Sequence, residues 1–276
     1  MIEEISTKHD VVGVTSVDDE LFALLRRDDN QVAVYSVNDY QLLRHLHLPG
    51  LKGDNGNDMT SCVRHKCLYA SDWANRCIHR YDLSSKVGAK KKWIANGHIS
   101  KWSVPGRPYG LSVTPGSCNL LVTCQWPSKL VELRADSGQP VRQITLQSDI
   151  ERLRHAVQLT TGQYVVCHSE LFRWRTVLHR VCRVDDEGRV TRSYGGQRGR
   201  GVGQLSEPCH LAVDEDSQFT FVADRDNDRV VLLSPTLELV RHISEGVSRP
   251  CRLYFHQTTR RLFVSQGGGG VVFIQL

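Results

Sequence analysis

Arginine and tryptophan side chains offer the clearest recognition chemistry in this sequence. Arginine outnumbers lysine by 26 to 9, and its planar guanidinium binds phosphate or carboxylate groups through two parallel hydrogen bonds. Tryptophan rings beside guanidinium groups form stacking surfaces for unpaired bases and also anchor protein interfaces. The pattern predicts a partner-binding surface that contains Trp73, Arg107, Trp126, Arg173, Trp174, Arg175, Arg198 and Arg200.

Two histidines recur at corresponding places of a repeated pattern that is described below. The position that His210 holds in PCHLAV is held elsewhere by Gly110, His155 and Arg252. Two histidines could ligate a metal, but catalytic zinc takes three protein ligands, and a neighbouring arginine repels a cation. We therefore expect these four residues to line a polar channel, with no metal and no other cofactor.

Motifs for covalent or phosphate chemistry are missing from the sequence. No GxSxG nucleophile motif occurs, and the glycine run 267–270 is not followed by a helix, so it predicts a hairpin rather than a phosphate-binding loop. The nine cysteines are an odd number without CxxC pairs or zinc-finger spacing, which favours buried or half-buried free thiols. A protein that is not an enzyme is expected.

The net charge of +5 is unevenly placed along the 276 residues. Residues 76–107 hold eight basic side chains against one acidic one, and residues 173–200 hold eight against three, so the remainder is net acidic. Clustered positive charge attracts polyanions. The segments QRGRG at 197–201 and KKK at 90–92 therefore leave RNA as an alternative ligand, whereas six aspartates on the same predicted loops oppose it: Asp28, Asp29, Asp72, Asp224, Asp226 and Asp228.

The N-terminal residues argue against a secretory leader. Glu3 and Glu4 stand where such a leader has a basic start and an apolar stretch, and no run of 18 apolar residues occurs in the sequence. We therefore expect a cytoplasmic protein that does not contact membranes.

A repeated pattern of short apolar runs and polar turns organises the chain. Its clearest copy, residues 207–243, predicts four strands at 209–213, 219–223, 229–233 and 238–243, joined by turns rich in Asp, Ser and Pro. Similar patterns occupy residues 11–48, 59–95, 108–146, 153–196 and 249–276. Six units of about 46 residues are typical of a β-propeller. We therefore predict an all-β, six-bladed β-propeller of four-stranded antiparallel blades that forms a single domain over residues 1–276.

The last unit supplies three strands instead of four. An open ring would expose strand edges that invite aggregation, and residues 2–6 precede the first unit without a partner of their own. The N-terminal strand is therefore predicted to pair with the last blade and close the ring.

The fifth unit resembles an NHL repeat. GQLSEPCHLAVDEDSQFTFVADRDNDRVVLLSP carries a Gly-Gln lead-in, a Pro before the inner strand and an Ala-Asp-x-x-Asn-x-Arg-Val hairpin. SDWANRCIHRYD and RRDDNQVAVYS repeat that hairpin more weakly, whereas units three, four and six depart from it. The resemblance implies a propeller similar to the C-terminal one of tripartite-motif (TRIM-NHL) ubiquitin ligases, although no RING spacing or heptad run is present in this sequence.

Three functions remain open on this basis. The first is a non-catalytic scaffold, a monomer that binds a protein or peptide through its loop-rich face and could act as a substrate reader related to ubiquitin-ligase NHL domains. The second is single-stranded RNA binding through the Arg/Trp-rich loops. The third is a metal-dependent propeller enzyme that resembles lactonases or amidating lyases. The first is the function we expect.

Overall fold

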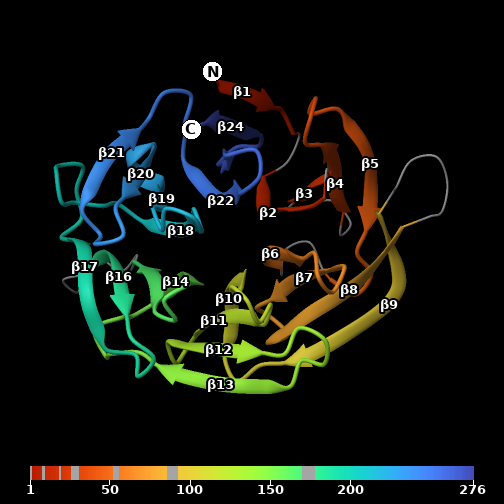
Figure 1. The fold of residues 1–276 in the computed structure, drawn as a ribbon, viewed down its shortest axis with the longest axis horizontal. Coiled ribbons are helices and arrows are strands. Elements are labelled where there is room, and N and C mark those ends of the chain that lie inside the picture. Colours follow the sequence, from red (N-terminus) through yellow and green to blue (C-terminus); the bar gives the residue numbers. More distant parts are fainter. Residues whose placement is uncertain are drawn as a thin grey trace.

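The structure is a computed structural model that describes residues 2–7, 10–18, 20–25, 31–51, 56–85, 93–169 and 178–276. Its strands form six four-stranded antiparallel sheets, which stand as blades around one axis (Figure 1). The helical content of the described residues is one short 3-10 turn, η1 (Arg225–Asn227). The predicted all-β, six-bladed propeller is confirmed.

Each blade runs from an inner to an outer strand. Blade 1 contains β2 (Val11–Val17), β3 (Glu20–Leu25), β4 (Gln31–Ser36) and β5 (Leu42–His47). Blade 2 contains β6 (Gly56–Cys62), β7 (Cys67–Asp72), β8 (Cys77–Ser85) and β9 (Trp93–Ser103). Blade 3 contains β10 (Arg107–Val113), β11 (Leu120–Gln125), β12 (Lys129–Leu133) and β13 (Pro140–Thr145).

The second half of the chain repeats this arrangement. Blade 4 contains β14 (Leu153–Gln158), β15 (Tyr164–His168), β16 (His179–Val184) and β17 (Val190–Gly196). Blade 5 contains β18 (Pro208–Val213), β19 (Thr220–Asp224), β20 (Arg229–Leu233) and β21 (Leu239–Ile243), each bound within one residue of its prediction. Blade 6 contains β22 (Pro250–His256), β23 (Arg261–Gln266), β24 (Val271–Gln275) and β1 (Ile2–Ile5).

The ring closes through the strand pair predicted from the sequence. β1 runs antiparallel to β24, with Ile2 opposite Ile274 and Ile5 opposite Val271. The glycine run that replaces the usual hairpin in blade 6 makes the tight turn before β24, because Gly268, Gly269 and Gly270 all have φ near +100°, a region that glycine enters without steric cost. The seam is therefore a backbone hydrogen-bonded pair between the two ends of the described chain.

The hydrophobic core that the described residues form is divided into six clusters, each lying between two neighbouring blades. Second strands such as β11 and β19 are buried along their whole length, whereas outer strands such as β13 and β21 are largely exposed. A blade buries both faces of its middle strands only when another blade packs on each side, which is the physical reason why the repeats form one ring.

One sequence expectation was wrong in blade 2. The second unit was expected to end at residue 95, but β9 extends to Ser103 and pairs Trp102 with Ile78 of β8. The half-buried ring of Trp102 packs 5.8 Å from the ring of Tyr69. Trp102 is therefore part of the outer strand, beyond the predicted end of the unit.

All nine cysteines lie in described residues and are unpaired, seven of them buried, with Cys118 and Cys251 half-buried. The expected free thiols are confirmed. Among the described residues, no helix is long and apolar enough to cross a membrane.

Candidate functional site

The loop-rich face brings together three of the predicted partner-binding residues. Trp73 lies between β7 and β8, Trp126 between β11 and β12, and Arg107 begins β10. The guanidinium carbon of Arg107 lies 4.8 Å from the ring centroid of Trp73 and 5.2 Å from that of Trp126. Both distances are within the range of cation–π attraction, so the two rings and the cation form one platform across blades 2 and 3.

This platform is one wall of a pocket of about 220 Å³, called the aromatic pocket below. Among the described residues that line it, three are arginines and none is acidic: Trp73, Arg107, Tyr109, Gln125, Trp126, Arg152 and Arg154. The Trp126 side chain is 59% exposed. A large aromatic surface that folding leaves in water is typical of the anchor of an interface.

Arg154 and Glu207 hold the floor of the aromatic pocket in place. The buried guanidinium of Arg154 donates to Glu207 at 2.9 Å, to the Tyr109 hydroxyl at 2.8 Å and to the Ser169 hydroxyl at 3.2 Å. Glu207 also forms an ion pair with Arg225, whose guanidinium nitrogen lies 3.7 Å from its carboxylate oxygen. Because the partners of Arg154 are fixed by the fold, the pocket is formed before a ligand arrives, which lowers the entropic cost of binding.

Two more of the predicted partner-binding residues are described, and they lie away from the aromatic pocket. Arg198 is exposed and pairs with Asp226 at 2.6 Å and with the Ser206 hydroxyl at 2.8 Å. Arg200 is also exposed, and its carbonyl accepts a hydrogen bond from Arg229. Neither lines the aromatic pocket. Arg173, Trp174 and Arg175 fall outside the described residues, as do residues 90–92.

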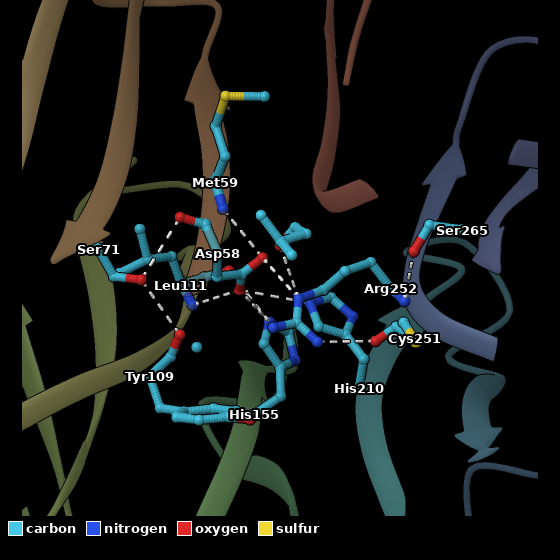
Figure 2. Close-up of polar contacts among 12 residues, drawn as sticks. Asp58, Met59, Ser71, Tyr109, Leu111, His155, His210, Cys251, Arg252 and Ser265 are labelled. Atoms are coloured by element: carbon cyan, nitrogen blue, oxygen red, sulfur yellow. Dashed lines mark hydrogen bonds and ion pairs between the residues drawn. The ribbon is translucent and has the colours of Figure 1, made fainter. Parts of the chain in front are cut away.

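The four predicted channel-lining residues occupy equivalent places on four inner strands. In each of these strands the register shifts at or next to the residue, at Gly110 in β10, His155 in β14, His210 in β18 and Arg252 in β22. A bulge turns a side chain away from the regular pleat. Here the bulges direct the two imidazoles and the guanidinium toward one another near the axis (Figure 2).

Asp58 of β6 is the centre of this axial cluster, and sequence reasoning missed it. Its Oδ2 lies 3.3 Å from His210 Nε2 and 3.7 Å from His155 Nε2, and its Oδ1 lies 3.4 Å from Arg252 Nε. It also accepts the backbone N–H groups of Met59 and Leu111 (Figure 2). The repeat in this blade was expected to begin at residue 59, whereas β6 begins at Gly56; extending the sequence register of Gly110, His155, His210 and Arg252 to this blade would have found Asp58.

Hydrogen bonds define the protonation of the two histidines. His210 Nδ1 faces the Leu253 N–H at 3.3 Å and accepts from it, so the proton is on Nε2 and points toward Asp58. His155 Nε2 donates to the Leu111 carbonyl at 3.0 Å. Burial and the neighbouring His210 lower the pKa of His155 to about 3, and burial holds the pKa of His210 well below its ordinary value. Both rings are neutral and stack 3.7 Å apart.

These contacts do not suit a metal at Asp58, His155 and His210, although their donor atoms lie within 4.8 Å of one another. A histidine that binds a metal through Nε2 carries its proton on Nδ1, and that nitrogen then cannot face a hydrogen-bond donor. His210 Nδ1 faces an N–H donor instead, and the Arg252 guanidinium already balances the carboxylate. The cluster is therefore an internal ion pair that joins four blades.

A second cavity of about 230 Å³ lies along the later halves of the inner strands. His155 and His210 line it together with Ser and Thr side chains of β2, β6 and β10 such as Ser16, Ser61 and Ser112. The first two hydroxyl groups are committed to the fold: Ser61 donates to the Ser16 carbonyl, and the Ser16 hydroxyl contacts the Tyr254 hydroxyl.

Known proteins share the fold of this chain. No sequence family and no curated protein matches it. Among solved structures, U3-55K aligns with a TM-score of 0.67 and 14% identity over 100% of this chain and 98% of that one. A streptogramin B lyase aligns at 0.65 and 10% identity over 99% and 96% of the two chains. Virginiamycin B lyase from Staphylococcus aureus aligns at 0.64 and 13% identity over 96% and 82%. At these identities the likeness is one of fold.

Proposed function

We propose that this propeller is a non-catalytic recognition module that binds a protein or peptide partner, with the aromatic pocket as the anchor of the interface. The observation that carries this proposal is the Arg107 guanidinium between the rings of Trp73 and Trp126, one of which is 59% exposed. Arginine and tryptophan are the residue types that dominate binding energy at protein interfaces.

The size and charge of the aromatic pocket limit which ligands it can bind. A volume of about 220 Å³ is below the roughly 300 Å³ at which sites for drug-sized ligands begin, so it suits one large side chain of an extended segment. Three arginines and no acidic residue line it, and of the three Arg154 is already paired with Glu207. The proposed ligand is therefore a peptide in which an aromatic or long apolar side chain is flanked by Asp or Glu.

The hairpins that resemble NHL repeats support a kinship with NHL recognition domains. Asn75 donates its amide to Asp72 at 2.8 Å, and Asn227 does the same to Asp224 at 2.8 Å, so the Asp-x-x-Asn spacing has one structural role in blades 2 and 5. We extend the proposal to a reader of substrates, as in tripartite-motif ligases, acting in the cytoplasm as a monomer.

The alternative functions have weaker support. For RNA, the exposed Arg198 is already paired with Asp226, and carboxylates close to a cation weaken its attraction to phosphate. For a metal-dependent enzyme, two of the compared structures are lyases, but the axial histidines are oriented for hydrogen bonds to Asp58 and backbone groups.

A peptide-binding experiment tests the proposal. Fluorescently labelled peptides with an aromatic residue between acidic residues are titrated into the wild type and into Arg107→Ala and Trp126→Ala variants, with Arg134→Ala, an exposed arginine beyond β12, as the matched control. We expect each pocket variant to weaken binding at least about 30-fold, since hot-spot truncations cost about 2 kcal/mol or more, and the control to bind as the wild type does.

Three results would count against it. Equal binding by the wild type and the pocket variants would show that the aromatic pocket is not part of the interface. Equal binding of basic and acidic peptides would show that the arginines of the pocket do not select acidic ligands. Salt-sensitive binding of single-stranded RNA that is lost in an Arg198→Ala, Arg200→Ala variant would favour the RNA alternative instead.

A further inference from the structure

Three metal-ligating side chains of different types converge where β7 and β8 meet at the loop-rich face. His79 Nε2 lies 3.2 Å from Asp72 Oδ2 and 3.6 Å from Cys77 Sγ, and all three donor atoms lie within 4.8 Å of one another. The residues are buried, with Asp72 and Cys77 fully so and His79 3% exposed. This cluster, called the hairpin cluster below, is distinct from the axial cluster around Asp58.

Blade 5 shows what the hairpin cluster lacks. Asp224 ends β19 just as Asp72 ends β7, and each aspartate pairs in register with the first residue of the next strand, Arg229 in blade 5 and Cys77 in blade 2. In blade 5 the Arg229 guanidinium donates to Asp224 at 2.7 Å and balances the buried carboxylate. In blade 2 a thiol stands in that place, so the buried carboxylate of Asp72 has no fixed cation from the equivalent residue.

Two of the three donor separations match those around a tetrahedral zinc ion, and the third, between Asp72 and Cys77, is within 4.8 Å. Zinc bonds of about 2.3 Å to sulfur and about 2.0 Å to nitrogen or oxygen give ligand-to-ligand edges of roughly 3.6 Å for S and N and roughly 3.3 Å for N and O in a tetrahedron. The observed separations are 3.6 Å and 3.2 Å. Thiolate, imidazole and carboxylate are also the three ligand types that zinc takes in proteins.

Hydrogen bonds around the hairpin cluster fix its carboxylate, while the buried Nδ1 of His79 has no hydrogen-bond partner among the described residues. The Asn75 backbone and side chain donate to the two oxygens of Asp72, at 2.9 Å and 2.8 Å, which fixes the carboxylate as outer-shell donors do at metal sites. Cysteine and aspartate approach the same imidazole nitrogen. They cannot therefore form a nucleophile–base–orienter relay, which needs the two ring nitrogens to face different partners.

We propose that Asp72, Cys77 and His79 form a zinc-binding site, with a water molecule as the fourth ligand. On binding, the S–H bond of Cys77 is replaced by a Zn–S bond and its proton is released to solvent, while the zinc ion supplies the positive charge that Arg229 supplies in blade 5. The site would tie the ends of the loop that carries Trp73 and so stabilise one wall of the aromatic pocket.

Cobalt(II) is the probe for this site, because it takes zinc positions and reports thiolate ligation by a charge-transfer band in the near ultraviolet and by intense tetrahedral bands in the visible. The purified, metal-stripped protein is titrated with Co²⁺ and then with Zn²⁺. We expect one equivalent of Co²⁺ to produce both bands and one equivalent of Zn²⁺ to abolish them. We expect the Cys77→Ser variant to lose the charge-transfer band. We expect the His79→Gln variant to lose the tetrahedral bands.

Matched variants keep the result interpretable. Cys62→Ser removes another buried thiol that also contacts a histidine, His65 at 3.2 Å, and should leave the bands unchanged. Cys77→Arg copies blade 5 and should fold, as judged by circular dichroism, without binding cobalt. A folded wild-type protein that shows no thiolate band at one equivalent, or a band that survives Cys77→Ser or Cys77→Arg, would overturn the proposal.

Discussion

Asp58 of blade 2 and His210 of blade 5 meet near the propeller axis with 3.3 Å between Oδ2 and Nε2, across 152 residues of sequence. Arg252 of blade 6 reaches the other oxygen of the same carboxylate. Contacts between residues this far apart in the sequence form only when the ring is closed, so the axial cluster depends on the whole fold.

Removing the charge of Asp58 should destabilise the propeller strongly. In Asp58→Asn the buried guanidinium of Arg252 loses its carboxylate, and breaking a buried ion pair costs about 3–5 kcal/mol. Urea unfolding measures the loss, with the exposed Asp136→Asn as control. An Asp58→Asn, Arg252→Met double variant should recover part of it; a single variant as stable as the wild type would show that Asp58 does not balance Arg252.

Acid should destabilise the protein well above the pH at which carboxylates titrate. Burial, followed by the charge of a neighbouring arginine, lowers the pKa of His168 and of His179 to about 4 each, from an ordinary value of 6.5. The unfolded chain therefore takes up protons that the folded one refuses, and stability falls as the pH falls from about 6.5 to about 4, by up to about 1.4 kcal/mol per histidine per pH unit.

The share of the pH dependence that comes from His168 can be measured separately. Arg180 donates to His168 Nε2 at 3.2 Å, and a glutamine carbonyl can accept that bond without titrating. Denaturant unfolding of His168→Gln at pH 7 and pH 5 should show a smaller difference in stability than the wild type. An equal difference would place the acid sensitivity elsewhere.

Deleting residues 1–8 should destabilise the entire domain in one transition. The deletion removes β1 from β24 and takes Ile5 out of the cluster between blades 6 and 1. Calorimetry should show a single transition at a lower temperature. A milder test is Ile5→Ala, for which a cost of about 2–4 kcal/mol is expected; a shortened chain that melts like the intact one would contradict the closure.

A methyl group at Gly110 should be poorly tolerated. Its Cβ would lie 2.6 Å from the Arg154 carbonyl oxygen and 2.7 Å from the His155 ring, and such overpacking costs about 1–3 kcal/mol. In Gly201→Ala the new methyl meets only the flexible end of Gln204, so that variant serves as the control. Thermal melts of the two proteins should differ clearly, and equal melts would show that β10 can move outward.

Local patterns in the sequence predicted the ring well. Turn-forming residues and strand periodicity act over a few residues, so they predicted the strands of blade 5 to within one residue. The segment 2–6, which had no partner in its own unit, predicted the strand that closes the ring. The convergence of Trp73, Arg107 and Trp126 followed from the same logic, because loops at equivalent points of successive blades open on one face.

Pairings between distant blades could not be predicted in the same way. No local pattern links Asp58 to Arg252, or Arg154 to Glu207, because their proximity depends on the diameter of the closed ring and on the bulges in the inner strands. The end of the second unit was predicted too early because a strand and an extended connection have the same local preferences, and the hydrogen bonds to β8 decide between them.

The bulges have a further consequence for the order of the blades. Following the ring, the axial positions are held by Gly13, Asp58, Gly110, His155, His210 and Arg252. These six side chains are complementary in size and charge: Gly13 and Gly110 leave space for the larger residues, and the single carboxylate of Asp58 balances the single guanidinium of Arg252. The axial residues therefore cannot all be made alike: without Asp58 the charge of Arg252 would be unbalanced, and a larger residue at Gly110 would collide with Arg154 and His155.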